Sequence, residues 1–134
     1  MSEQRFEERK RELNDAVLRL GEAIVQPEND VIRDSVIQRF EFSFELTWKT
    51  LQLYLEREGL DAGSPRQALK SAFVQGIIPD EKEANIWLNM LEDRNLTTHT
   101  YHEDLAKTIY RKITDTYIGR LRIMNDRIQG LAWN

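Results

Sequence analysis

The sequence predicts an all-α protein, an antiparallel up-and-down helical bundle of four long helices and one short helix, dimerising through one of them. Apolar residues recur at three- to four-residue spacing through long stretches. Gly and Pro are few, and most of the six Gly and three Pro lie between those stretches. Short turns between long helices favour antiparallel packing. At this length a single domain is expected, covering residues 1–134.

The composition excludes several classes of protein. Cysteine is absent, which excludes disulfides, thiolate nucleophiles and cysteine zinc sites. No signal peptide and no membrane-spanning segment is apparent, so we expect a cytoplasmic protein without membrane contact. The formal net charge of −4 excludes a strong nonspecific attraction for nucleic acid, so any contact with RNA must be local.

The first helix is expected at about residues 3–25. Its apolar residues share one helical face and are Phe6, Leu13, Val17, Leu20 and Ile24. Charged residues lie between them, and Pro27 interrupts the pattern. One amphipathic helix follows from this spacing.

The second helix is expected to be long and apolar on two faces. Asn29 or Asp30 can cap its start, and no Gly or Pro follows until Gly59. One stripe contains Ile32, Val36, Phe40, Phe44, Trp48, Leu51 and Leu55, and a second contains Phe42, Leu46 and Leu53. The second stripe indicates dimerisation or a partner, and a central position within the bundle is an equally good interpretation.

The third helix is short. Ser64 is a strong N-cap, Pro65 suits the first helical position, and Gln67 can complete a capping box. The helix should run to about Gln75, because Gly76 follows it.

Two more helices complete the bundle. Asp80 should cap the fourth, with Glu83 completing a second capping box. The last should start near His102 or Glu103 and end near Gly130. Their apolar stripes are Ala84, Trp87, Leu88 and Leu91 in the fourth helix, and Leu105, Ile109, Ile113, Tyr117 and Met124 in the last.

Chemistry-bearing residues concentrate between the fourth and last helices. Arg94 and His99 would lie roughly 140° apart on an unbroken helix. A helix that ends near Thr98 would let His99 fold back toward Arg94, or let both face a second copy across a composite cleft. An arginine fork suits a phosphate, and histidine is the usual proton shuttle near neutral pH. The pair therefore suits metal-independent RNA cleavage through the ribose 2′-hydroxyl.

Simpler interpretations of the same residues stand beside this one. Arg94 can pair with Glu92, Asp93 or a neighbouring helix, and His99 can be a surface or capping residue. The potential metal ligands here are His99, His102, Glu103 and Asp104. They lack an evident distant fourth ligand, so neither a metal nor another cofactor is expected.

Three segments carry a family resemblance: FEFSFELTWKTL at residues 40–51, GSPR at 63–66 and WLNMLEDRNLTTHTY at 87–101. They resemble the nucleotidyltransferase substrate-binding proteins, a family of the HEPN superfamily that includes HepT-type toxins. The resemblance covers nearly the whole chain in order. It implies a dimerising helical bundle that forms a hetero-oligomer with a minimal nucleotidyltransferase encoded nearby.

The resemblance also implies roles for individual residues. Arg94 and His99 match the R-x4-6-H motif of the ribonuclease site in toxin-antitoxin members, and Asn95 is the polar residue after the arginine. His99-Thr100-Tyr101 matches H-x-Y, whose tyrosine the nucleotidyltransferase silences by adenylylation (AMPylation), here Tyr101. The older family view implies instead a noncatalytic subunit that binds the substrate of the nucleotidyltransferase. A plain homodimeric scaffold is the third alternative.

Overall fold

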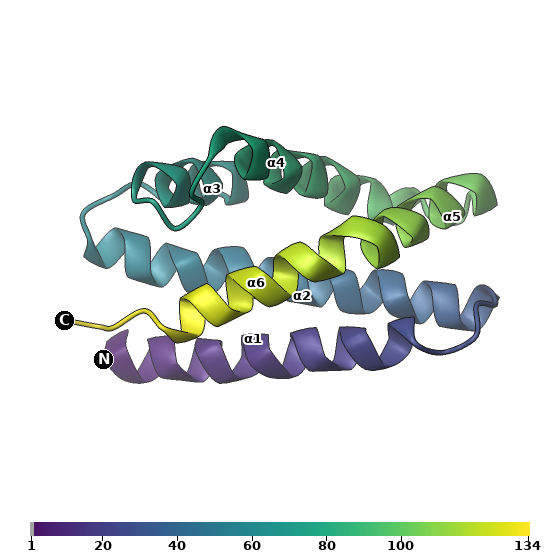
Figure 1. Cartoon of the computed structure of the whole chain (residues 1–134), viewed down its shortest axis with the longest axis horizontal. Helices are drawn as coiled ribbons and strands as arrows, with labels where there is room; N and C mark the ends of the chain where they lie inside the picture. Colours follow the sequence, from purple (N-terminus) through teal and green to yellow (C-terminus); the bar gives the residue numbers. More distant parts are fainter. Residues whose placement is uncertain (1) are drawn as a thin grey trace.

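The computed structural model describes residues 2–134 and consists of an elongated antiparallel helical bundle (Figure 1). Its α-helices are α1 (Ser2–Ile24), α2 (Asp30–Arg57), α3 (Pro65–Val74), α4 (Glu81–Leu96), α5 (Glu103–Lys112) and α6 (Ile118–Gln129). A 3-10 turn, η1 (Thr97–His99), and a π turn, η2 (Ile113–Tyr117), complete the helical structure. The predicted all-α fold is confirmed.

Helix α2 lies at the centre of the bundle and contacts α1, α3, α4, α5 and α6. Its fully buried apolar residues are Val36, Phe40, Phe44, Leu51 and Leu55. Of the second predicted stripe, Leu46 and Leu53 are half-buried, whereas Phe42 is 56% exposed. The central position therefore explains most of the two-faced pattern, and Phe42 is left uncovered.

Three of the predicted helix caps are confirmed. The side chain of Asn29 accepts a hydrogen bond from the backbone N–H of Ile32 at 2.8 Å. In the same way, Ser64 accepts one from Gln67 at 3.2 Å, and Asp80 accepts one from Glu83 at 2.8 Å. Each satisfies an N–H group that has no partner within its helix. The caps fix the starts of α2, α3 and α4.

The two predicted capping boxes are wrong in their second half. Glu83 does not return to the start of α4, because its side chain is buried and accepts hydrogen bonds from Arg120 at 3.0 Å and Arg127 at 3.1 Å. Trp87 donates to the same carboxylate at 3.3 Å. The Gln67 amide likewise bonds one turn further along α3. Charge-assisted bonds to two arginines outcompete a single capping bond.

The predicted last helix differs from a regular α-helix at one point. Helices α5 and α6 continue into each other through η2, where the N–H of Ile118 donates to the carbonyl of Ile113. This five-residue step is a π turn, in place of the four-residue step of an α-helix. It ends at Tyr117, whose ring stacks on Phe40 of α2 with centroids 5.6 Å apart.

The C-terminal tail joins the bundle at the end where the chain begins (Figure 1). Trp133 packs on Phe6 of α1 with ring centroids 5.2 Å apart, and Lys10 donates to the carbonyl of Leu131 at 3.0 Å. Across residues 2–134, no helix has the length and apolarity that crossing a membrane requires.

Candidate functional site

The end of α4 is built by threonine side chains. Thr97 donates to the carbonyl of Arg94 at 2.7 Å, and Thr100 donates to the carbonyl of Thr97 at 2.9 Å. Such local bonds compete with the α-helical ladder, so the chain tightens into η1 after Leu96. The predicted helix end near Thr98 is confirmed, and it places His99 in the 3-10 turn.

Arg94 points toward α2 and lies between two carboxylates. Its Nη1 is 3.4 Å from Glu41 Oε2, and its Nε is 3.5 Å from Glu45 Oε1. Nη1 also donates to the hydroxyl of Thr97 at 3.3 Å. The Nε atom is buried and has no hydrogen-bond acceptor among residues 2–134. Of the partners considered from sequence, the neighbouring helix is therefore the one found.

Asp93, the preceding residue, belongs to a different network. Its buried carboxylate accepts hydrogen bonds from the hydroxyl of Tyr117 and from Lys112, the latter at 3.1 Å. Burial raises the pKa of Tyr117 well above its ordinary value, and the hydrogen bond and charge of Asp93 raise it further. The neutral phenol is thus a permanent donor that holds the end of α4 against η2.

The other predicted site residues lie on the surface. Asn95 and His99 are exposed, and Tyr101 is 78% exposed. The rings of His99 and Tyr101 meet edge to face with centroids 6.3 Å apart. The ring of His102, the next residue in the sequence, has its centroid 4.3 Å from that of Tyr101. Tyr101 is therefore accessible and flanked by both histidines of the chain.

The single chain does not join Arg94 to His99. Among residues 2–134, no hydrogen bond, ion pair or ring contact links them. The arginine is engaged by Glu41 and Glu45 of α2, whereas the side chain of His99 is exposed. The predicted folding back of His99 onto Arg94 is therefore not seen, and a cleft shared between two copies stays a prediction.

The described residues give no support to a metal site. Within residues 2–134, no group of three or more histidine, cysteine or acidic side chains could hold a metal ion.

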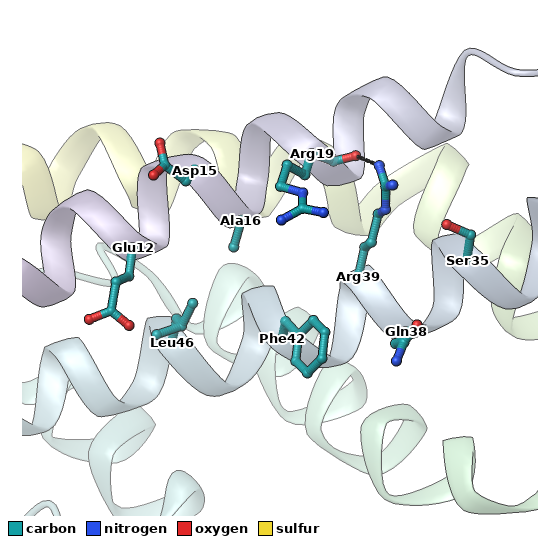
Figure 2. A pocket seen from close by; sticks show the side chains of 9 residues that line it. All are labelled: Glu12, Asp15, Ala16, Arg19, Ser35, Gln38, Arg39, Phe42 and Leu46. Atoms are coloured by element: carbon teal, nitrogen blue, oxygen red, sulfur yellow. Dashed lines mark hydrogen bonds between the residues drawn. The ribbon is translucent and has the colours of Figure 1, made fainter.

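A second feature is a groove of about 410 Å³ between α1 and α2 (Figure 2). The residues that line this α1–α2 groove are Glu12, Asp15, Ala16, Arg19, Ser35, Gln38, Arg39, Phe42 and Leu46. Figure 2 shows the carboxylates of Glu12 and Asp15 toward one end and the guanidinium groups of Arg19 and Arg39 toward the other. Arg39 donates to the carbonyl of Arg19 at 2.6 Å.

Sequence reasoning missed Glu41 and Glu45 as partners of Arg94 and Tyr117 as the partner of Asp93. The two glutamates are one helical turn apart on α2, which is a signal for a shared target. Their target lies about fifty positions away in the sequence, so only the tertiary structure identifies it.

The fold and the site together form a helical bundle in which an exposed histidine and an exposed tyrosine follow the end of a helix that bears an arginine. Residues 8–130 match the family described as "Nucleotidyltransferase substrate binding protein like". The chain belongs to this family, as its sequence motifs predicted, and the family is named for its association with nucleotidyltransferases.

Two relatives support the assignment. Over 94 residues the chain is 31% identical to a Haemophilus influenzae protein named "Probable ribonuclease HepT", an alignment that covers 66% of this chain and 62% of that protein. A crystal structure of a protein from Thermus thermophilus has a TM-score of 0.74 and 37% sequence identity. That match covers 88% of this chain and 96% of the other.

Proposed function

We propose that the chain is the HEPN-type partner subunit of a minimal nucleotidyltransferase and acts as a HepT-like toxin, a metal-independent endoribonuclease. The observation that carries the proposal is the exposed pair of His99 and Tyr101 just beyond the helix end that bears Arg94. The name of the Haemophilus influenzae relative points to the same activity.

The proposed reaction uses the side chains of Arg94, Asn95 and His99. His99 removes the proton of a ribose 2′-hydroxyl, whose oxygen then bonds to the adjacent phosphorus while the bond from phosphorus to the 5′-oxygen breaks. The leaving oxygen takes a proton from solvent or from the imidazolium. Arg94 stabilises the charge on the phosphorane, and Asn95 supplies a polar contact beside it. The products are a 2′,3′-cyclic phosphate and a 5′-hydroxyl.

Adenylylation of Tyr101 is the proposed silencing step. The phenolic oxygen attacks the α-phosphorus of ATP bound to the nucleotidyltransferase, pyrophosphate leaves, and the phenol proton passes to a base or to solvent. The exposure of Tyr101 permits this attack. Its ring lies 6.3 Å from that of His99, so a bulky anionic adduct would block the histidine and repel RNA.

Homodimerisation is proposed through the α1–α2 groove. A two-fold axis near Phe42 would place the acidic end of one groove, with Glu12 and Asp15, on the arginine end of the other. The exposed ring of Phe42 would then be covered by its symmetry mate.

The activity is tested with purified chain, freed of partner and modification, and labelled single-stranded RNA in the presence of EDTA. We expect cleavage to cyclic phosphate ends, reduced at least about a hundredfold in His99→Ala and Arg94→Ala. His102→Ala is the matched control and should cleave normally, because His102 lies outside the motif. Uncut RNA with folded protein, or full cleavage by His99→Ala, would refute the proposal.

The modification is tested by measuring the intact mass of the chain after co-expression with the nucleotidyltransferase, with ATP present. We expect one or more AMP additions to the chain and none to Tyr101→Phe. A Tyr101→Phe chain that still gains the mass would place the modification elsewhere.

The alternative function is a noncatalytic subunit that binds the substrate of the nucleotidyltransferase. The engagement of Arg94 by two carboxylates favours it, because this arginine is not free in the single chain. It predicts a stable complex with the nucleotidyltransferase and no turnover of RNA by any form of the chain.

A further inference from the structure

Two negatively charged side chains lie at the single positive charge of Arg94. Glu41 and Glu45 lie one turn apart on α2, and each is within 3.5 Å of the guanidinium. Glu45 also accepts a hydrogen bond from Trp48 at 3.1 Å, which fixes its carboxylate in place. Lys49, 3.8 Å from Glu45, is half-exposed and offsets this charge only weakly. Arg94, Glu41 and Glu45 together therefore carry a net charge of about −1 at neutral pH.

An RNA phosphate that binds Arg94 in this arrangement comes close to both carboxylates. A bidentate contact would bring its oxygens to about 2.8 Å from the guanidinium, which is also within a few ångströms of Glu41 and Glu45. The side chain of Arg94 is only 23% exposed, and the carboxylates occupy its Nε and Nη1 edges. Like-charge repulsion in this half-buried region is stronger than in open water.

The closed position is also imperfect for the arginine itself. The buried Nε has no hydrogen-bond acceptor among residues 2–134, and both carboxylate distances exceed those of a good charge-assisted bond. An unsatisfied buried donor favours any rearrangement that gives it a partner. Arg94 therefore occupies a position that a stronger acceptor can draw it out of.

We propose that Glu41 and Glu45 form a latch that holds Arg94 in a closed position and keeps anionic ligands away from it. This inference rests on the proposed function for the identity of the anion, an RNA phosphate. Opening consists of a rotamer change of Arg94 that exchanges two carboxylates for a phosphate. Neutralising the two glutamates should therefore open the site without any change in the fold.

The latch itself is tested without RNA. Folded protein is treated with phenylglyoxal, and modification of Arg94 is followed by peptide mass spectrometry. The double variant Glu41→Gln with Glu45→Gln should modify Arg94 several-fold faster, because it lacks the charges that hold the guanidinium. Glu92→Gln, which removes an exposed carboxylate from α4, should match the wild type. Equal rates in the double variant and the wild type would overturn the latch.

The effect on the ligand is tested by fluorescence anisotropy with a short single-stranded RNA, in a His99→Ala background that prevents cleavage. The double variant should bind roughly fivefold to tenfold more tightly than its parent, and Glu92→Gln should change binding less than twofold. Adding Arg94→Ala should abolish the gain. Weaker binding by the double variant would overturn the latch and make both glutamates positioning residues. A gain that survives Arg94→Ala would also overturn it.

The two proposals fail in different ways. Faster modification of Arg94 without RNA binding by any variant would leave the latch standing and refute the ribonuclease function. RNA cleavage by the wild type with unchanged Arg94 reactivity would leave the function standing and refute the latch.

Discussion

Adjacent residues at the end of α4 serve different purposes because their side chains leave the helix in different directions. Asp93 points to Lys112 and Tyr117 and is buried there. Arg94 points to Glu41 of α2 and keeps part of its guanidinium exposed. The contacts of Asp93 hold the end of α4 in place. The contact of Arg94 with Glu41 pairs a charge near the surface.

Tyr117→Phe should lower the free energy of unfolding by about 2 kcal/mol, because it removes a donor to a buried carboxylate. Urea denaturation followed by circular dichroism measures the change. Tyr110→Phe is the control, since Tyr110 is also buried and its hydroxyl makes no hydrogen bond with residues 2–134. This variant should lose less than about 0.5 kcal/mol. Equal losses in the two variants would contradict a special role for the Asp93 contact.

At the scale of the element, Glu83 ties the first turn of α4 to the last helix. Burial alone would raise its pKa, but hydrogen bonds from Arg127 and Trp87 and the charges of Arg127 and Arg120 together lower it below the ordinary value. The carboxylate is thus ionised in the folded state and bridges two arginines that no other acid in α4 reaches.

The lowered pKa makes stability depend on acidity. A carboxyl group whose pKa is lower in the folded state stabilises the fold above its unfolded pKa of about 4.3, and this stability is lost as the pH falls below that. Glu83→Gln should therefore make the free energy of unfolding less dependent on pH between about pH 5 and pH 3. It should also lower that free energy by about 2 kcal/mol at pH 7. Thermal unfolding across this range measures both effects. Glu81→Gln, exposed in the same turn, should keep the wild-type profile.

Local signals in the sequence predict the elements well, and the reason is physical. The caps at Asn29, Ser64 and Asp80 depend on residues three positions away, so they can be recognised without tertiary structure. The direction of the Glu83 side chain depends on α6, and that of Arg94 depends on α2. These long-range choices could not be predicted from periodicity.

The same limit applies to the candidate site. The motif residues were found from the sequence, and the helix end that places His99 in η1 followed from the threonines. The carboxylates that engage Arg94 were not predicted, because an i, i+4 pair of glutamates on a long helix is also typical of a solvated face.

At the scale of the whole molecule, the bundle leaves one large aromatic side chain uncovered in the middle of its longest helix. Phe42 lies in the α1–α2 groove between an acidic end and a basic end. The helix end that bears Arg94 lies toward the end of the bundle away from both chain termini (Figure 1). Terminal tags are therefore suited to measurements of assembly and of RNA binding.

Phe42→Glu should convert the proposed dimer to a monomer, because two like charges would replace the apolar contact between the two Phe42 rings at the axis. Size-exclusion chromatography with light scattering measures the mass at several concentrations. Val74→Glu is the control, since Val74 is also apolar and exposed, at the end of α3, and it should leave the mass unchanged. A wild-type monomer at all concentrations, or a Phe42→Glu dimer, would contradict the proposed interface.

The π turn η2 sets the rotational phase of the last helix. Asp93 takes its partners from before and within the turn, at Lys112 and Tyr117, while Glu83 takes its partners after it, at Arg120 and Arg127. Removing one residue from η2 would turn α6 by about 100° relative to α5. A chain shortened in this way could keep one of the two buried carboxylates paired, but not both. The additional residue of the π turn thus sets the rotation of the last helix about its axis, so that this helix contacts both Asp93 and Glu83 of α4.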